Sequence, residues 1–91
     1  MNKQELISYT AEKTGFSKKD TELTLNAAIE VITKALEDNE KVQLVGFGSF
    51  EVKQRAARIG RNPKTKEAID IPASQMPVFK PSKALKDSLN Q

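Results

Sequence analysis

The apolar residues of this chain change their spacing once, near residue 40, and that change limits the folds the chain can adopt. Before residue 40 they recur every three to four positions, as on one face of a helix. After residue 40 they alternate with polar residues, as in a strand that is covered on one side. With 91 residues in all, we expect one α+β domain in which helices come first and an antiparallel sheet follows.

Two helices can be located from their capping residues. Asn2 and Ser17 each stand before an apolar repeat as potential N-caps, with an acidic residue three positions later. We expect a first helix over residues 3–14, ended by Gly15, and a second helix over about residues 18–38. The two helices would form a helix-turn-helix body.

The second helix carries an apolar surface that is too broad for one packing partner. Leu23, Ala27 and Val31 widen its main stripe beyond the ~100° that faces a single neighbour. Either the sheet or a second copy of the chain covers the remainder, and we expect both to be needed. A lone domain of this size also buries only about 60 to 65% of its unfolded surface, which favours a homodimer.

A β-hairpin is expected after the helices. Residues 41–45 and 49–55 alternate apolar and polar side chains and flank Gly46 and Gly48. Both glycines can take the positive φ angles of a tight reversal, so the segment between the strands predicts a turn. As a cradle for phosphate the same glycines are a weak signal, because no helix N-terminus follows them.

A protruding ribbon is expected between the hairpin and the last strand. Residues 53–71 form two strand continuations joined by a loop at Asn62 and Pro63. Pro72 and Pro77 are expected where a strand bends or runs along an edge, since proline donates no ladder hydrogen bond. A short helix should follow.

The expected organisation is a single domain over residues 1–91. It comprises a helical dimerisation body at 1–41, a three-stranded antiparallel sheet at 42–81 with a ribbon arm at about 54–73, and a C-terminal helix at 82–91, capped by its first residue, a serine. The N-terminus lacks the apolar run of a signal peptide, and no window holds the ~18 apolar residues of a membrane span. We therefore expect a cytoplasmic protein.

The charges of the chain are segregated along its length. Residues 1–41 hold six Lys and eight acidic residues, whereas residues 42–91 hold nine Lys or Arg and four acidic residues. One run contains no acid, and its basic residues are Lys53, Arg55, Arg58, Arg61, Lys64 and Lys66. Such a run is typical of a surface that binds a polyanion, but a solvated basic loop has the same composition.

The composition excludes several classes of enzyme site. The chain contains no Cys and no His, which excludes disulfides, thiolate or imidazole metal ligands and nucleophiles that need a His partner. Glu51, Glu67 and Asp70 are possible Mg²⁺ ligands, but they show no paired-metal spacing, and charge balance on a basic ribbon explains them better. We expect no enzymatic activity, no cofactor and no small-molecule substrate.

Together these features resemble the bacterial HU/IHF family of DNA-architectural proteins. The residues that carry the resemblance are Gly46-Phe47-Gly48, Phe50, and then Arg55, Arg58, Gly60, Arg61, Asn62 and Pro63. The likeness covers essentially the whole chain, including residues 79–86. It is closer to HU than to the heterodimeric, sequence-specific IHF branch.

The resemblance implies an intertwined homodimer whose two ribbon arms wrap double-stranded DNA through its minor groove, in association with the bacterial nucleoid. By position it places Pro63 at the tip of the arm, where its ring would intercalate at a base step and kink the duplex. The other residues proposed to contact DNA are Lys53, Arg55, Arg58, Arg61, Asn62, Lys64 and Lys66 in or near the arm, and Lys3, Lys80, Lys83 and Lys86 on the body.

Two alternatives use the same basic residues. One is an RNA-binding or ribosome-associated basic module, although sequence-specific RNA recognition usually needs exposed aromatic residues and none lies between residues 53 and 66. The other is a sequence-specific, IHF-like DNA-bending factor.

Overall fold

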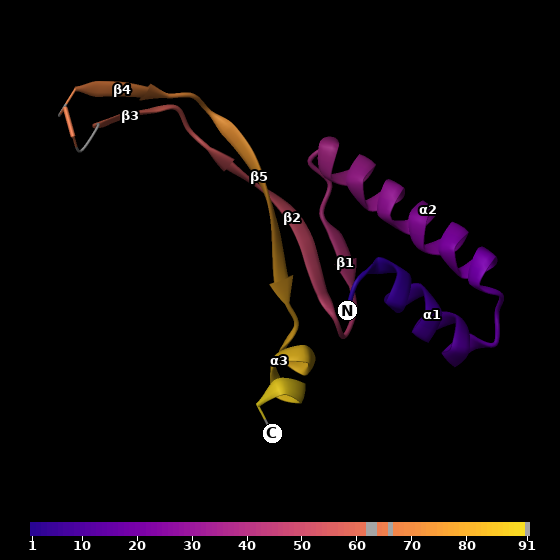
Figure 1. Ribbon diagram of the computed structural model, residues 1–91. Helices are drawn as coiled ribbons and strands as arrows, with labels where there is room; N and C mark the ends of the chain where they lie inside the picture. Colours follow the sequence, from indigo (N-terminus) through magenta and orange to yellow (C-terminus); the bar gives the residue numbers. More distant parts are fainter. Residues whose placement is uncertain (62–63, 66, 91) are drawn as a thin grey trace. The chain divides into compact units, whose positions relative to one another are not determined.

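The computed structural model describes residues 1–61, 64–65 and 67–90, and within these residues it contains three helices and five strands (Figure 1). In chain order they are α1 (Lys3–Thr14), α2 (Lys18–Glu37), β1 (Val42–Leu44), β2 (Gly48–Arg55), β3 (Arg58–Arg61), β4 (Ala68–Ile71), β5 (Ser74–Pro81) and α3 (Lys83–Leu89). The predicted α+β order is confirmed. The chain divides into two compact units, Met1–Lys34 and Ala35–Gln91.

Side-chain caps begin the first two helices where the sequence predicts them. The Asn2 side chain accepts a hydrogen bond of 2.9 Å from the backbone N–H of Glu5. The Ser17 hydroxyl accepts one of 3.0 Å from the backbone N–H of Asp20. Each bond satisfies a donor that the first turn of a helix leaves free. Gly15, at φ 80°, ends α1 in the left-handed conformation that glycine adopts without strain.

The second helix ends in a Schellman motif, one residue before its predicted end. Asn39 takes a left-handed conformation with φ 59°. Its N–H donates to the carbonyl of Leu36 at 3.0 Å, and the N–H of Glu40 donates to the carbonyl of Ala35 at 2.8 Å. These two bonds satisfy carbonyls that the last turn of a helix leaves free. The motif turns the backbone out of the helix and into the sheet.

The three-stranded sheet has the order β1, β2, β5, and both pairings are antiparallel. The β2 strand lies in the centre and pairs with β5 from Gly48 opposite Pro81 to Arg55 opposite Ser74. Pro77 lies opposite Val52 in β5, an edge strand of this sheet. The edge position expected for Pro77 is therefore confirmed.

The predicted ribbon is also present, as the pairing of β3 with β4 from Arg58 opposite Ile71 to Arg61 opposite Ala68. This pairing keeps the register of β2 with β5, so the two ladders are segments of one continuous ribbon. Residues 56–57 and 72–73 belong to no strand. Proline at position 72 has no N–H to donate, which explains why the ladder is interrupted there.

The two glycines of the hairpin have different roles. Gly46 has φ +84°, so the predicted turn glycine is confirmed. The same prediction for Gly48 is wrong, because this residue begins β2 without a positive φ. A Cβ at Gly48 would lie 2.6 Å from the carbonyl oxygen of Lys80 and 2.7 Å from the ring of Phe79. Glycine is needed at Gly48 because β5 passes too close for any side chain.

The aromatic contacts of the sheet unit centre on Phe79. Its ring centroid lies 5.3 Å from that of Phe47 and 5.0 Å from that of Phe50, with the rings tilted by 43° in both pairs. Tilted rings at this separation attract each other beyond the effect of burial alone. Phe50 is also the cross-strand partner of Phe79, so the cluster fixes the pairing of β2 with β5.

Few side chains are buried in the described part of the chain. Its buried hydrophobic residues are Ile7 and Ala11, both in α1. Large apolar side chains of α2 remain in contact with solvent, notably Leu23 and Val31, which are 60% and 69% exposed. Much of the broad apolar surface of α2 is therefore uncovered in the single chain, and we expect a second copy to cover it.

A concentration-dependent melting temperature is the expected result for such a dimer, because only the folded form associates. Each tenfold rise in protein concentration should add about 1.4 kcal/mol to the free energy of unfolding. Val31→Asp should lower the melting temperature and the mass seen in sedimentation, whereas Glu30→Gln on the same helix should change neither. A folded monomer of the unmodified chain at micromolar concentration would contradict the expectation.

Candidate nucleic-acid interface

The register of β2 against β5 gathers basic side chains on one side of the sheet. Directly opposed residues of an antiparallel pair project to the same side. The pairs on this side are Ser49 with Lys80, Glu51 with Val78, Lys53 with Met76, and Arg55 with Ser74. We call this side the basic face, since it carries the exposed side chains of Lys53, Arg55 and Lys80. The opposite side carries the aromatic pair Phe50 and Phe79.

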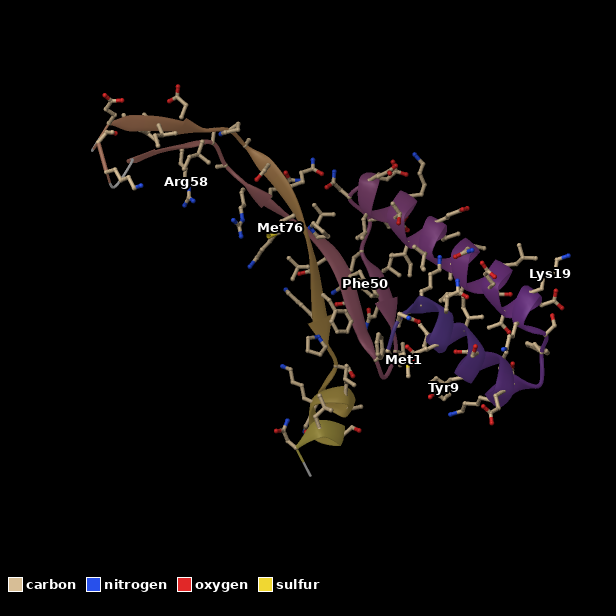
Figure 2. The ribbon with its side chains drawn as sticks, in the orientation of Figure 1. Met1, Tyr9, Lys19, Phe50, Arg58 and Met76 are labelled. Atoms are coloured by element: carbon tan, nitrogen blue, oxygen red, sulfur yellow. The ribbon has the colours of Figure 1, made fainter. Side chains whose placement is uncertain are left out.

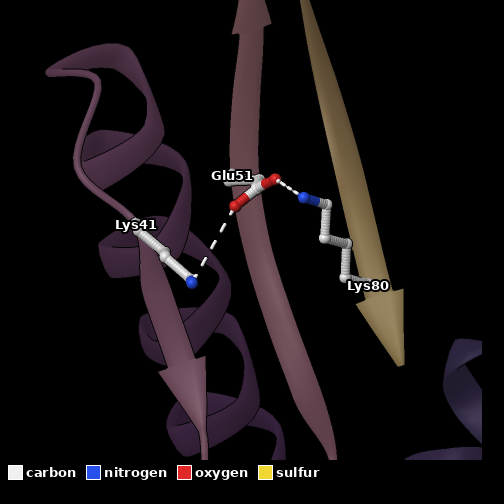
Figure 3. Close-up of polar contacts among 3 residues, drawn as sticks. All are labelled: Lys41, Glu51 and Lys80. Carbon is white, nitrogen blue, oxygen red and sulfur yellow. Dashed lines mark ion pairs between the residues drawn. The ribbon is translucent and has the colours of Figure 1, made fainter. Parts of the chain in front are cut away.

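Glu51 places a negative charge within the basic face. Its Oε1 lies 2.6 Å from the Nζ of Lys80, and its Oε2 lies 4.0 Å from the Nζ of Lys41 (Figure 3). The hydrogen bond from Lys80 is the main cause that lowers the pKa of Glu51 below its ordinary value. The charges of Lys80, Lys41 and Lys53 add to this effect, whereas partial desolvation opposes it. Glu51 is therefore ionised at neutral pH and holds the Lys80 side chain against β2.

This ion pair also bears on the acidic residues considered as possible Mg²⁺ ligands. Glu51 is engaged by two lysines, Lys41 and Lys80. In the described ranges, no group of three or more acidic residues could hold a metal ion. Glu51 is best explained as a counter-charge for lysine.

The β3–β4 ribbon, which we call the arm, carries a further basic side chain. Arg58 is exposed and projects from β3 (Figure 2). Gly60 provides room on the same side of the ribbon, because a Cβ there would lie 2.9 Å from the Cδ1 of Ile71. Ile59, on the other side, is 74% exposed and opposes Asp70. The arm thus presents basic and apolar side chains without a core of its own.

The remaining residues predicted to bind nucleic acid lie in several places. Lys3 is the first residue of α1, and Lys64 is exposed in a turn after β3. Lys83 and Lys86 are exposed on α3, whose N-cap Ser82 accepts a hydrogen bond of 3.1 Å from the N–H of Leu85. The backbone of Arg61 ends β3 opposite Ala68. Asn62, Pro63 and Lys66 lie outside the described residues.

Two contacts on the basic face were not anticipated from the sequence. One is the Glu51–Lys80 ion pair. The other is a hydrogen bond of 3.3 Å in which Nη2 of Arg55 donates to Sδ of Met76. Both contacts join β2 to β5, so they depend on a cross-strand register that cannot be read from the spacing of residues along the chain.

Comparison with known proteins agrees with this arrangement. Residues 1–90 match the protein family described as "Bacterial DNA-binding protein". The "DNA-binding protein HU" of Clostridium pasteurianum is 60% identical over 91 residues, which is 100% of both chains. That of Geobacillus stearothermophilus is 57% identical over 98% of this chain and 99% of its own.

Solved structures give the same result. A cocrystal structure of Anabaena HU with DNA matches with a TM-score of 0.88 and 47% identity, over 98% of this chain and 97% of the other. HU from Thermotoga maritima matches with a TM-score of 0.70 and 43% identity, over 98% of each chain.

None of the described helices is both long and apolar enough to cross a membrane.

The ion pair predicts how Glu51 titrates. Its carboxyl should titrate below the ordinary range of glutamate. NMR of the side-chain carboxyl carbon measures this titration. Lys80→Met should raise this pKa toward the ordinary value by removing the hydrogen bond, whereas Lys83→Met on α3 should leave it unchanged. Because the folded-state pKa is lowered, the stabilisation by this pair is present at neutral pH and is lost as the pH falls through that pKa. An ordinary pKa in the unmodified protein would contradict the ion pair.

Proposed function

Because the chain belongs to the HU/IHF family of bacterial DNA-binding proteins, we propose that it is an architectural protein that binds and bends duplex DNA with little dependence on base sequence. The observation that carries the proposal is the basic face of β2 and β5, together with the exposed basic residue Arg58 of the arm. Lysine and arginine side chains that neutralise phosphates release condensed counterions, which drives binding. Such contacts carry no sequence information by themselves. The role is non-enzymatic.

The two basic regions are assigned different contacts. Lys53, Arg55 and Lys80 on the sheet would lie against the phosphates of the duplex, together with Lys83 and Lys86 on α3. The arm is narrow, since it has only two strands, and it would enter the minor groove, where arginine is attracted to the negative potential. This contact would be completed by Arg61 and by the tip residues Asn62, Pro63, Lys64 and Lys66. Lys3 would contact a further phosphate.

As a homodimer, the protein would have two basic faces and two arms. Proteins of this family form dimers, and the uncovered apolar residues of α2, including Leu23 and Val31, provide surface for one here. Two arms that contact the same duplex would curve it around the sheet. Bending of this kind compacts the chromosome, so we place the protein at the nucleoid, in the cytoplasm.

The two alternatives considered from the sequence receive less support. A single-strand RNA reader stacks bases on aromatic side chains, and the described arm strands, residues 58–61 and 68–71, contain none. A sequence-specific IHF-like factor would be expected to resemble IHF more than HU, whereas the relatives described above are HU proteins. DNA binding without strong sequence preference therefore fits best.

Replacement of Arg58 tests the phosphate contacts. Arg58→Ala should weaken binding about equally for duplexes of unrelated sequence, and should reduce the slope of log affinity against log salt by roughly one for each phosphate that the arginine neutralises. Electrophoretic shifts at several salt concentrations measure both effects. Lys13→Ala, which removes the same charge from the last turn of α1, should change the slope less. A weakening that depends on base sequence would indicate that Arg58 reads base edges instead.

Replacement of Pro63 tests the bending. Proline presets φ for a turn, but a rigid apolar ring between Arg61 and Lys64 can also wedge into a base step, which costs a few kcal/mol of unstacking that added contacts offset. Pro63→Ala keeps the net charge, so it should retain most of the salt dependence and lose bending. Energy transfer between fluorophores at the ends of a short duplex measures the bend. An unchanged bend at equal occupancy would leave Pro63 as a turn residue only.

A further inference from the structure

Met76 occupies a position on the basic face that its sequence context does not reveal. It lies directly opposite Lys53 in the pairing of β2 with β5, so the two side chains project to the same side. Its Sδ accepts the hydrogen bond of 3.3 Å from Nη2 of Arg55. The thioether thus contacts one cation, Arg55, and lies across the ladder from another, Lys53, and the proposed function assigns both to DNA phosphates.

The thioether of Met76 holds Arg55 weakly, and the side chain is accessible to oxidants in solution. Thioether sulfur is a weak hydrogen-bond acceptor, so the guanidinium can leave it for a phosphate oxygen. Met76 is 40% exposed. The chain contains no Cys, and its only other methionine is Met1. Oxidation of sulfur in this protein is therefore limited to two side chains, of which only Met76 contacts the basic face in the described residues.

Oxidation would convert this weak contact into a strong one. The thioether sulfur attacks one oxygen of hydrogen peroxide, the O–O bond breaks as the S–O bond forms, and the second oxygen leaves as water after it takes up the proton of the first. Sulfur is oxidised by two electrons and peroxide is reduced by two. The product, methionine sulfoxide, is polar and can be reduced again by a reductase. Its oxygen is a good acceptor for a guanidinium, and such charge-assisted hydrogen bonds are short and strong.

We infer that Met76 is a reversible oxidation site that regulates the basic face by capturing Arg55. In the reduced protein Arg55 exchanges readily between sulfur and phosphate. In the oxidised protein the sulfoxide oxygen competes with phosphate for the same guanidinium, and for the Lys53 ammonium across the ladder. The inference rests on the proposed function, since its consequence is weaker binding to DNA.

The test compares reduced and peroxide-treated protein. Mild hydrogen peroxide should add one oxygen to the peptide that contains Met76, as read by mass spectrometry. The oxidised protein should bind a duplex about 3- to 10-fold more weakly, the effect expected when one charged hydrogen-bonding group is diverted. Treatment with methionine sulfoxide reductase should restore the affinity.

Variants separate Met76 from Met1 and from general damage. After the same peroxide treatment Met76→Leu should keep its affinity, because it has no thioether at position 76 and only Met1 can be oxidised. Arg55→Gln should bind weakly from the start and weaken little more on oxidation. Equal weakening in Met76→Leu, unchanged affinity after oxidation of Met76, or resistance of Met76 under conditions that oxidise Met1 would each overturn the inference. The inference would also be overturned if the oxidised unmodified protein bound DNA more weakly but also melted at a lower temperature than oxidised Met76→Leu, because general damage would then explain the loss.

A second measurement is independent of DNA. The NMR resonances of the Arg55 side-chain Nη–H groups should shift on oxidation of the free protein, because the acceptor of the Nη2 hydrogen bond changes from sulfur to oxygen. If reduced protein fails to bind duplex DNA, the proposed function fails, whereas the Arg55 shift still reports on the contact itself. An unchanged Arg55 resonance in protein that carries the sulfoxide would refute the capture.

Discussion

The antiparallel pairing of β2 with β5 is the constraint on which the rest of the sheet unit depends. It fixes which side chains share a side, so Lys53, Arg55 and Lys80 gather on one surface while Phe50 and Phe79 meet on the other. Gly48 permits this pairing, since no side chain fits between it and the carbonyl of Lys80. The same register continues into the arm, so the position of the arm strands is set by the sheet from which they extend.

Features of the fold that depend on neighbouring residues could be predicted from the sequence. The starts of α1 and α2 follow from Asn2 and Ser17, because a cap acts on an N–H only three residues away. The change of apolar period separates helices from strands for the same local reason. Gly48 was misread because glycine has two uses, and only the path of β5, a strand distant in the sequence, shows that close approach is the one required here.

In the candidate site, too, features that depend on single residues could be predicted, whereas contacts between distant segments could not. Basic composition identified Lys53, Arg55 and Arg58, because charge is a property of each residue. The contacts of Glu51 with Lys80 and of Arg55 with Met76 were missed, since both require a register between segments distant in the chain. An acid within a surface for polyanions repels phosphate, but here it also restricts one lysine side chain. Its effect on binding therefore combines a weaker attraction with a smaller loss of side-chain entropy.

The prolines of β5 have a consequence for solubility. An edge strand offers unpaired backbone groups to which a strand of another molecule can add, and this is a common route to aggregation. Pro77 and Pro81 both lie in β5, so two of its eight residues have no N–H to donate. Lys80 adds a charge next to Pro81, and both features disfavour strand addition. The β5 edge of this sheet is thus poorly suited to the addition of a strand from another copy of the chain.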